Sequence, residues 1–301
     1  MDLGKDNLNN KPSYRLTHNY ILMKKAKVLV KSTCQLGESI LWDNRKNSIY
    51  WVDILDKHIY KHNFGSESTT VWNIEKHISK IIPDGQDSFI VAMQGILAYW
   101  EENTNILTTI VDIPEENGQI RTNDGGLDLD GNLWIGTMHM DALPDRGKLY
   151  CYKDHKLEVM LDAVSIPNGI VWSGELPYTY FIDTYTNEIR RYDFTQIING
   201  VVPYEMLVKI PSEYGSPDGM CIGPDGNLWV AHWGGYGVYC WDINTGELLD
   251  RIYVDAPHVT SCVFGGPNNQ DLFISTAQVG LSKEQLLKYP NSGAVFHYRM
   301  M

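Results

Sequence analysis

Four oxygen-bearing side chains stand at matched places in this chain, each followed by a small residue or an acid and then a short apolar stretch. They are Glu38 in "LGESILW", Asn123 in "RTNDGGL", Asn168 in "SIPNGIVW" and Asp218 in "SPDGMCI". Carboxylate and amide oxygens are hard ligands that suit Ca²⁺, Mg²⁺ or Mn²⁺, and Zn²⁺ with an added water. If these side chains meet in space, they predict a site for one divalent metal ion, with Ca²⁺ as the first choice.

Each of these segments taken alone predicts only a turn. Pro-Asn-Gly and Pro-Asp-Gly are ordinary turn tripeptides, and the "DGN" stretches at 130–132 and 225–227 are interpreted as outer hairpin loops. A metal site therefore requires a fold that brings distant segments together.

Short apolar strands alternate with turns rich in Gly, Asn and Asp along the whole chain, for example "SIYWVDI", "NLWIGTM", "YTYFIDT" and "LFISTA". They group into units that repeat every 40–50 residues or so, the period of a four-stranded propeller blade. The pattern predicts an all-β, six-bladed β-propeller; a β-sandwich pair would not explain so regular a period. The units are expected to begin near Ser39, Asp87, Gly126, Gly169, Gly219 and Ser261.

The ring needs a closing strand, because a closed ring hides most sheet edges. The segment "KVLVKS" before the first unit is predicted to add that strand to the last blade, near "AVFHYRM". Residues 1–25 are interpreted as a polar N-terminal tail and 26–301 as the propeller. One turn per blade points at the central channel of a propeller, so the four oxygen-bearing side chains are expected to converge there, two of them carboxylates and two amides.

Composition restricts the function classes. The net charge of −12, from 25 basic and 37 acidic residues, argues against a nucleic-acid-binding protein. No apolar run approaches the roughly 20 residues of a membrane span. Five scattered cysteines without a CxxC pair favour a reducing compartment, and the cytoplasm is the expected location. The expected partner is a small molecule, with no nucleic acid or membrane, and the expected state is a monomer or weak homo-oligomer.

The chain resembles the SMP-30/gluconolactonase family, which includes regucalcin-like proteins and bacterial sugar lactonases. The matching segments extend from about Leu36 to Ala277 and are "LGESILWDNRKNSIYWVDI", "RTNDGGLDLDGNLWIGTM", "IPNGIVWS", "SPDGMCIGPDGNLWVAHWGG" and "VTSCVFGGPNNQDLFISTA". The resemblance implies a six-bladed propeller with one divalent metal in the channel. It also implies an enzyme that opens a sugar lactone, an aldonolactone such as gluconolactone, to the aldonic acid.

By this resemblance Glu38, Asn168 and Asp218 are expected to hold the metal. Arg121 and Asn123 match the family's "RxND" stretch and are expected to bind substrate.

At two other positions the match to the family pattern is less direct. The acidic residue that often follows "GTM" and faces substrate aligns with Asp141, beside His139. Ile40 replaces the Pro that usually follows in the first motif, so a changed turn with a retained Glu ligand is expected.

These groups support metal-assisted ester hydrolysis. A divalent ion can polarise a carbonyl and lower the pKa of a bound water. Asp218 can accept a proton from the attacking water, and the fork of donors on Arg121 can orient the substrate. A histidine base among His77, His139, His232 and His258 is the competing mechanism, whereas the absence of GxSxG argues against a serine hydrolase.

Two further functions remain open on the same residues. One is a broader lactonase or phosphotriesterase that uses the same metal. The other is a calcium-binding regulatory propeller without catalysis, although Arg121 in the channel favours substrate binding. Most of the nine tryptophans are expected to pack in blade cores. Trp233 in "HWGG" is a candidate for the channel mouth, although core packing is favoured for it as well.

Overall fold

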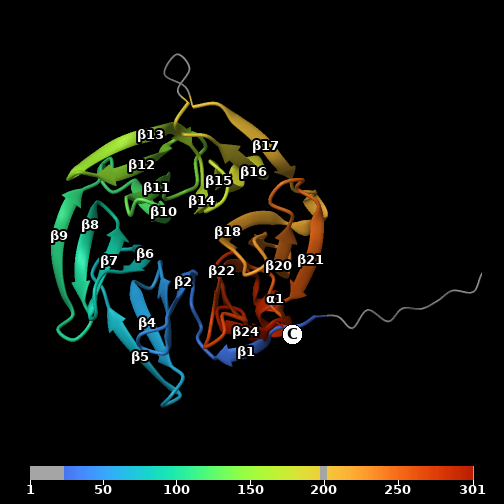
Figure 1. The fold of residues 1–301 in the computed structure, drawn as a ribbon. Helices are drawn as coiled ribbons and strands as arrows, with labels where there is room; N and C mark the ends of the chain where they lie inside the picture. Colours follow the sequence, from blue (N-terminus) through green and yellow to red (C-terminus); the bar gives the residue numbers. More distant parts are fainter. Residues whose placement is uncertain (1–23, 197–201, 301) are drawn as a thin grey trace, which may run out of the picture.

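The computed structural model describes residues 24–196 and 202–300, which form six four-stranded sheets arranged as a ring (Figure 1). Every pair of neighbouring strands is antiparallel, and in five sheets the strands follow chain order from the centre outward. The predicted all-β, six-bladed propeller is confirmed. The predicted tail lies outside the described residues except for Lys24 and Lys25.

Five sheets are continuous in sequence. They consist of β2 (Gly37–Asp43), β3 (Ser48–Asp53), β4 (His58–Asn63) and β5 (Ser68–Asn73); β6 (Ile78–Pro83), β7 (Ser88–Met93), β8 (Ile96–Glu101) and β9 (Ile106–Asp112); β10 (Ile120–Leu127), β11 (Leu133–His139), β12 (Gly147–Lys153) and β13 (Lys156–Val164); β14 (Pro167–Trp172), β15 (Thr179–Asp183), β16 (Glu188–Tyr192) and β17 (Tyr204–Lys209); and β18 (Ser216–Ile222), β19 (Leu228–Trp233), β20 (Gly237–Trp241) and β21 (Leu248–Tyr253).

The sixth sheet joins the two ends of the chain. It contains β22 (Val259–Gly265), β23 (Asp271–Thr276), β24 (Val295–Arg299) and, at its outer edge, β1 (Lys27–Val30). Val28 pairs with Phe296, and Val30 pairs with Val295. Figure 1 shows β1 in blue beside β24 in red. The predicted closure of the ring by "KVLVKS" is therefore confirmed.

One predicted boundary is wrong. The second unit begins with β6 at Ile78, not near Asp87, which lies in the loop between β6 and β7. The segment "ISKIIP" carries Ser79 and Lys80 among its apolar residues and ends in Pro83. It lacks the Asn-Gly or Asp-Gly pair of β10, β14 and β18, and its strand pattern was not recognised.

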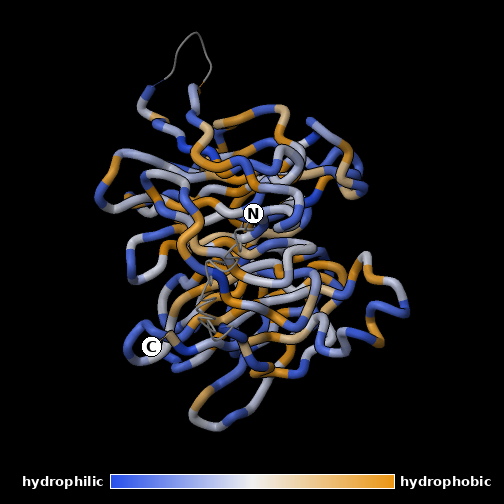
Figure 2. The backbone as a smooth tube through the Cα atoms, turned by 90° about the vertical axis from the view of Figure 1, so that its right-hand side faces the viewer, coloured by the Kyte–Doolittle hydropathy of each residue, from blue (hydrophilic) through white to orange (hydrophobic). Residues whose placement is uncertain are grey.

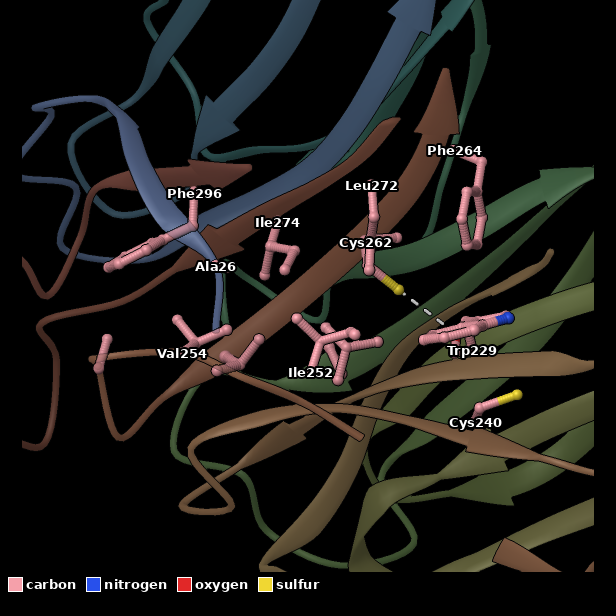
Figure 3. Packing of buried hydrophobic residues seen from close by; sticks show 14 of the residues in the cluster. Ala26, Trp229, Cys240, Ile252, Val254, Cys262, Phe264, Leu272, Ile274 and Phe296 are labelled. Atoms are coloured by element: carbon pink, nitrogen blue, oxygen red, sulfur yellow. Dashed lines mark hydrogen bonds between the residues drawn. The ribbon is translucent and has the colours of Figure 1, made fainter. Parts of the chain in front are cut away.

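The core consists of apolar clusters in which the sheets pack against one another. In the cluster drawn in Figure 3, Trp229 and Ile252 of the fifth sheet face Cys262, Phe264 and neighbouring residues of the sixth. The Cys262 thiol donates to the Trp229 carbonyl at 3.3 Å. Hydrophobic and hydrophilic stretches alternate along the chain through the body of the molecule (Figure 2), as expected for sheets packed face to face.

The hairpin loops predicted at 130–132 and 225–227 are confirmed. Gly131 and Gly226 adopt left-handed backbone, with φ of 83° and 77°, and each sits in a turn closed by a backbone hydrogen bond of 3.0 and 2.9 Å.

Helical structure is sparse among the described residues. It consists of the 3₁₀ turns η1 (Thr184–Thr186) and η2 (Ser212–Tyr214) and the helix α1 (Lys283–Lys288), which begins with a capping box between Ser282 and Gln285. In the described ranges no helix has the length and apolar character that a membrane crossing requires.

Candidate active site

A cavity of about 340 Å³ at the centre of the ring contains five of the residues singled out in the sequence. They come from the innermost strands of four blades (Figure 1), namely Glu38 from β2, Arg121 and Asn123 from β10, Asn168 from β14 and Asp218 from β18. The innermost strands thus bring these distant side chains to one place, as the repeat predicted.

Glu38, Asn123, Asn168 and Asp218 lie at β-bulges and not in turns before the strands, which corrects the interpretation of the motifs. Pairing of each innermost strand with the next one shifts register around Glu38, Asn123, Asn168 or Asp218. The innermost strands of the other two blades shift at the matching point. A bulge breaks the alternation of side chains and can re-aim one of them. Here the bulges accompany side chains that line the channel.

The glycines of the motifs serve close packing between blades. A Cβ on Gly169 would lie 2.4 Å from the Cβ of Met220, and one on Gly219 would lie 2.8 Å from the Thr260 carbonyl oxygen. Neither glycine has a positive φ, so these positions need the missing side chain and not the left-handed backbone. The Asn-Gly and Asp-Gly pairs therefore mark where one innermost strand touches the next.

Hydrogen bonds hold the amide side chains in place. Arg121 Nη1 donates to Asn123 Oδ1 at 2.6 Å, and Asn123 Nδ2 donates to the Pro167 carbonyl at 2.7 Å. Asn168 Nδ2 donates to Thr184 Oγ1 at 2.7 Å. Asn168 Oδ1 accepts a hydrogen bond from Asn123 Nδ2 at 3.3 Å. Each amide is thus oriented by a fixed partner.

The ionisable groups of the cavity are buried together. Burial, strengthened by the charge of Asp124, raises the pKa of Glu38 to about 8. Burial, together with the charges of Glu38 and Asp124, raises the pKa of Asp218 well above its usual value. Burial also lowers the pKa of Arg121 to about 10, although Glu38 and Asp218 act in the opposite direction. The positive charge of Arg121 opposes the rise in both carboxyl pKa values but does not cancel it.

A third carboxylate beside the cavity already pairs with a lysine side chain. Asp124 forms an ion pair with Lys80 of β6, with 2.6 Å between Nζ and Oδ1. Asp124 directly follows Asn123 in the "RTND" stretch, so the motif itself held the signal that sequence analysis did not use. Lys80 was missed because its strand was not recognised.

The donor set fits an oxygen-liganded cation. Asp218 Oδ1 is buried and has no hydrogen-bond partner among the described residues, which is rare for a carboxylate oxygen unless an ion or water completes it. Glu38 and the oriented Oδ1 of Asn168 line the same cavity. Within the described ranges, no three His, Cys, Asp or Glu side chains form a metal-holding group. The candidate set therefore depends on the Asn168 amide as its third ligand.

The remainder of the lining is largely apolar, and sequence analysis identified none of it apart from the channel-mouth alternative for Trp233. We call these side chains the apolar wall: Leu36, Leu55, Met138, Met140, Ala142, Ile166, Trp233 and Val279. The expectation that Trp233 packs in a blade core is wrong, because its indole lines the cavity and is only partly buried. Thr184 and Ser216 complete the polar part of the lining.

Asp141 is not brought into this cavity. Its side chain is 84% exposed, whereas its neighbours Met140 and Ala142 line the cavity. His139 is buried, and its Nδ1 accepts the backbone N–H of Asp141 at 3.1 Å.

The histidines considered as bases also lie outside the lining. His258 Nδ1 lies 2.9 Å from the Val279 carbonyl, and its ring stacks on Trp233 with 3.8 Å between centroids. His232 is buried against Tyr239, and burial lowers its pKa to about 4. His77 pairs with Gln94. His258 therefore supports a wall residue rather than facing the cavity itself.

Known proteins resemble the chain over most of its length. Regucalcin from Danio rerio is 30% identical over 275 residues, which cover 90% of this chain and 93% of that protein. A solved calcium-binding regucalcin from Agrobacterium tumefaciens has a TM-score of 0.85 at 26% identity and covers 91% of this chain and 93% of its own. A solved luciferin-regenerating enzyme has a TM-score of 0.82 at 28% identity, with 92% and 97% covered.

A family model described as "SMP-30/Gluconolactonase/LRE-like region" matches residues 36–278, which include every residue placed in the cavity lining except Val279. The match begins at the first innermost strand and ends just after β23 of the last blade. The chain therefore belongs to the SMP-30/gluconolactonase/LRE-like family.

Proposed function

We propose that this protein is a lactonase that works with one divalent cation, Ca²⁺ as first choice, held by Glu38, Asn168 and Asp218. The observation that carries the proposal is the buried, unpartnered Oδ1 of Asp218 in a cavity with a second buried carboxylate and a buried arginine. Membership of a family that contains gluconolactonases supports the reaction class. The family resemblance favours an aldonolactone as substrate.

When bound, the cation polarises the ester carbonyl and lowers the pKa of a water. The side chains of the chain supply the remaining steps. Asp218, a carboxylate at the cation site, accepts a proton from the attacking water. Arg121 uses Nη1 to hold Asn123 and presents its other donors to oxygens of the ring. Asn123 stays fixed by the Pro167 carbonyl.

The reaction balances as a simple hydrolysis. The water oxygen forms a bond to the carbonyl carbon, and the bond between that carbon and the ring oxygen breaks. The ring oxygen takes up a proton and becomes a hydroxyl, while the other product group is a carboxylate. One proton is released to solvent near neutral pH.

The test uses protein stripped with EDTA and re-supplied with Ca²⁺, Mg²⁺, Mn²⁺ or Zn²⁺ one at a time, followed by a panel of lactones. Asp218→Asn removes the charge and the proton acceptor while keeping the size of the side chain. We expect it to reduce kcat/KM at saturating metal by at least about 100-fold, at the low end of what general-base catalysis contributes.

The matched control is Asp84→Asn, at an exposed position in the loop after β6, which should leave activity and metal binding unchanged. Wild-type turnover by Asp218→Asn, with its fold intact by circular dichroism, would contradict the role given to Asp218.

A calcium-binding regulatory propeller without catalysis is the second candidate, and the name of the regucalcin relatives favours it. Buried Arg121 argues against a site that only buffers an ion, because a cation gains nothing from a neighbouring guanidinium. Tight Ca²⁺ binding without turnover of any lactone or phosphotriester would favour this candidate.

The cytoplasm is the cellular location that we propose. All five cysteines are free thiols, in keeping with a reducing compartment.

A further inference from the structure

The apolar wall surrounds the mouth of the cavity on one face of the ring. In an antiparallel blade, the start of the innermost strand and the loop between the second and third strands lie on the same face. Residues at these two kinds of position, from five blades, form most of the wall: Leu36 before β2, Leu55 in the β3–β4 loop, Met140 after β11, Ile166 before β14, Trp233 at the end of β19 and Val279 after β23.

These six side chains are only partly buried, although they are large and apolar. Partly exposed apolar side chains gathered around one opening mark a place where a ligand covers them. The His258 ring, stacked on Trp233, fixes the orientation of the largest of them.

Polar groups deeper in the cavity are largely paired with each other. The Thr184 hydroxyl accepts from Asn168 and donates to the Pro217 carbonyl at 2.8 Å. Asn123 Nδ2 is taken by the Pro167 carbonyl, and its Oδ1 is taken by Arg121. With Glu38, Asn168 and Asp218 assigned to the cation, the groups left for a ligand are the remaining donors of Arg121 and the Ser216 hydroxyl.

A polyhydroxylated ring does not suit a cavity that has polar groups only at its floor and an apolar wall at its mouth. Its ester group would meet the polar floor, but the hydroxyls away from the ester would face the apolar wall, and a buried hydroxyl without a partner is unfavourable. An alkyl substituent in the same place would be favourable, because it removes apolar surface from water on both sides.

We infer that the preferred substrate is a lactone with an apolar substituent on the ring, whose ester lies against Glu38, Arg121 and Asp218 while its alkyl chain lies against the apolar wall. This inference rests on the proposed lactonase activity and changes its substrate class from a sugar lactone to an alkyl lactone. The cavity of about 340 Å³ lies near the lower limit of ordinary ligand pockets, about 300–1,000 Å³, so the chain is expected to be short.

The test compares γ-lactones that carry no substituent, ethyl, butyl or hexyl on the ring carbon next to the ring oxygen, with an aldono-γ-lactone of the same ring size as reference. Burying one methylene group contributes about 0.8 kcal/mol, so kcat/KM should rise up to about fourfold per carbon until the chain leaves the cavity. The unsubstituted lactone should exceed the aldonolactone.

Two variants test the wall itself. Met140→Gln and Leu55→Gln exchange an apolar side chain for a polar one of similar length at two different blades. Each should lower the ratio of kcat/KM for the butyl lactone to kcat/KM for the unsubstituted lactone by at least about fourfold, the contribution of one methylene. Leu143→Gln is the matched control, because Leu143 is 44% exposed in the same loop as Met140 and does not line the cavity.

Binding of the corresponding alkyl lactams, which resist hydrolysis, provides a readout without turnover and is measured by calorimetry with and without Ca²⁺. If no lactone is hydrolysed but lactam affinity rises with chain length and falls in Met140→Gln, the inference stands and the proposed activity fails. If the aldonolactone is the best substrate and the variants do not change its ratio to the butyl lactone, the inference is wrong and the lactonase proposal stands. If no lactone is hydrolysed and lactam affinity does not depend on chain length, both the inference and the lactonase proposal are overturned.

Discussion

Replacing Gly169 by alanine tests whether the Asn-Gly motif exists for packing or for turning. The added Cβ would lie 2.4 Å from Met220 Cβ, 2.7 Å from Met220 N and 3.0 Å from the Asp218 carbonyl oxygen, where real Cβ contacts essentially never fall below 3.0 Å. The neighbouring atoms belong to the backbone and Cβ of β18 and cannot rotate away. β14 and β18 must therefore separate by at least 0.6 Å, the difference between 2.4 and 3.0 Å.

Overpacking of this kind costs about 1–3 kcal/mol, and we expect the upper end because two innermost strands must move. That corresponds to a decrease in Tm of roughly 5–10 °C, at about 2–4 °C per kcal/mol. The same movement displaces Asn168 and Asp218, so Ca²⁺ affinity should fall as well. Differential scanning fluorimetry and calcium titration measure the two effects.

Gly174→Ala is the control in the same blade. No atom lies within 4 Å of its added Cβ, and its φ is not positive. This variant should be neutral or stabilised by up to about 1 kcal/mol, because alanine restricts the unfolded chain. Equal Tm values for Gly169→Ala and Gly174→Ala would refute the packing role of Gly169.

Three further changes give distinct outcomes. Deleting residues 1–32 removes β1 and exposes the edge of β24, so Tm should fall well below that of a chain lacking residues 1–23; similar midpoints would mean that β1 adds little to ring stability. Arg121→Lys should keep Ca²⁺ affinity and lower kcat/KM about 10- to 100-fold, the loss of one charge-assisted hydrogen bond, and an equal fall in Ca²⁺ affinity would make Arg121 structural. Because the pKa of Glu38 is raised to about 8, the folded metal-free protein holds a proton that the unfolded chain releases above about 4.5; its unfolding free energy should therefore fall as pH rises from about 5 to 8. Urea titrations in EDTA should show that the unfolding free energy of Glu38→Gln falls less over this pH range than that of the unsubstituted protein. An equal fall in the two proteins would contradict this role of Glu38.

Local patterns in the sequence were sufficient for the architecture. A run such as "NLWIGTM" predicts a strand from its own residues, and repetition of such runs at one period predicts blades. The closing strand followed from the same reasoning, since "KVLVKS" had no partner in its own unit. β6 shows where this reasoning ends, because Lys80 interrupts its apolar pattern in order to reach Asp124 of the next blade.

The candidate metal ligands were also identifiable in the sequence, because each blade repeats the same position and a ring places equal positions around one axis. Their chemical setting was not. The sequence shows Asn-Gly and Asp-Gly and therefore predicts turns, while the structure places both motifs in bulges where neighbouring strands touch. Contact between blades is a property of the assembled ring and leaves no local pattern.

Sequence alone thus determined most of the strands, the number of blades, the closure of the ring and the side chains that meet at its axis. Only the tertiary structure decided what surrounds them: the ion pair that occupies Asp124, the exposure of Asp141 and the apolar wall. The wall comes from residues at or near the ends of strands in five blades. Such residues share no motif, because what they have in common is a position in space, and that position exists only after the blades have packed.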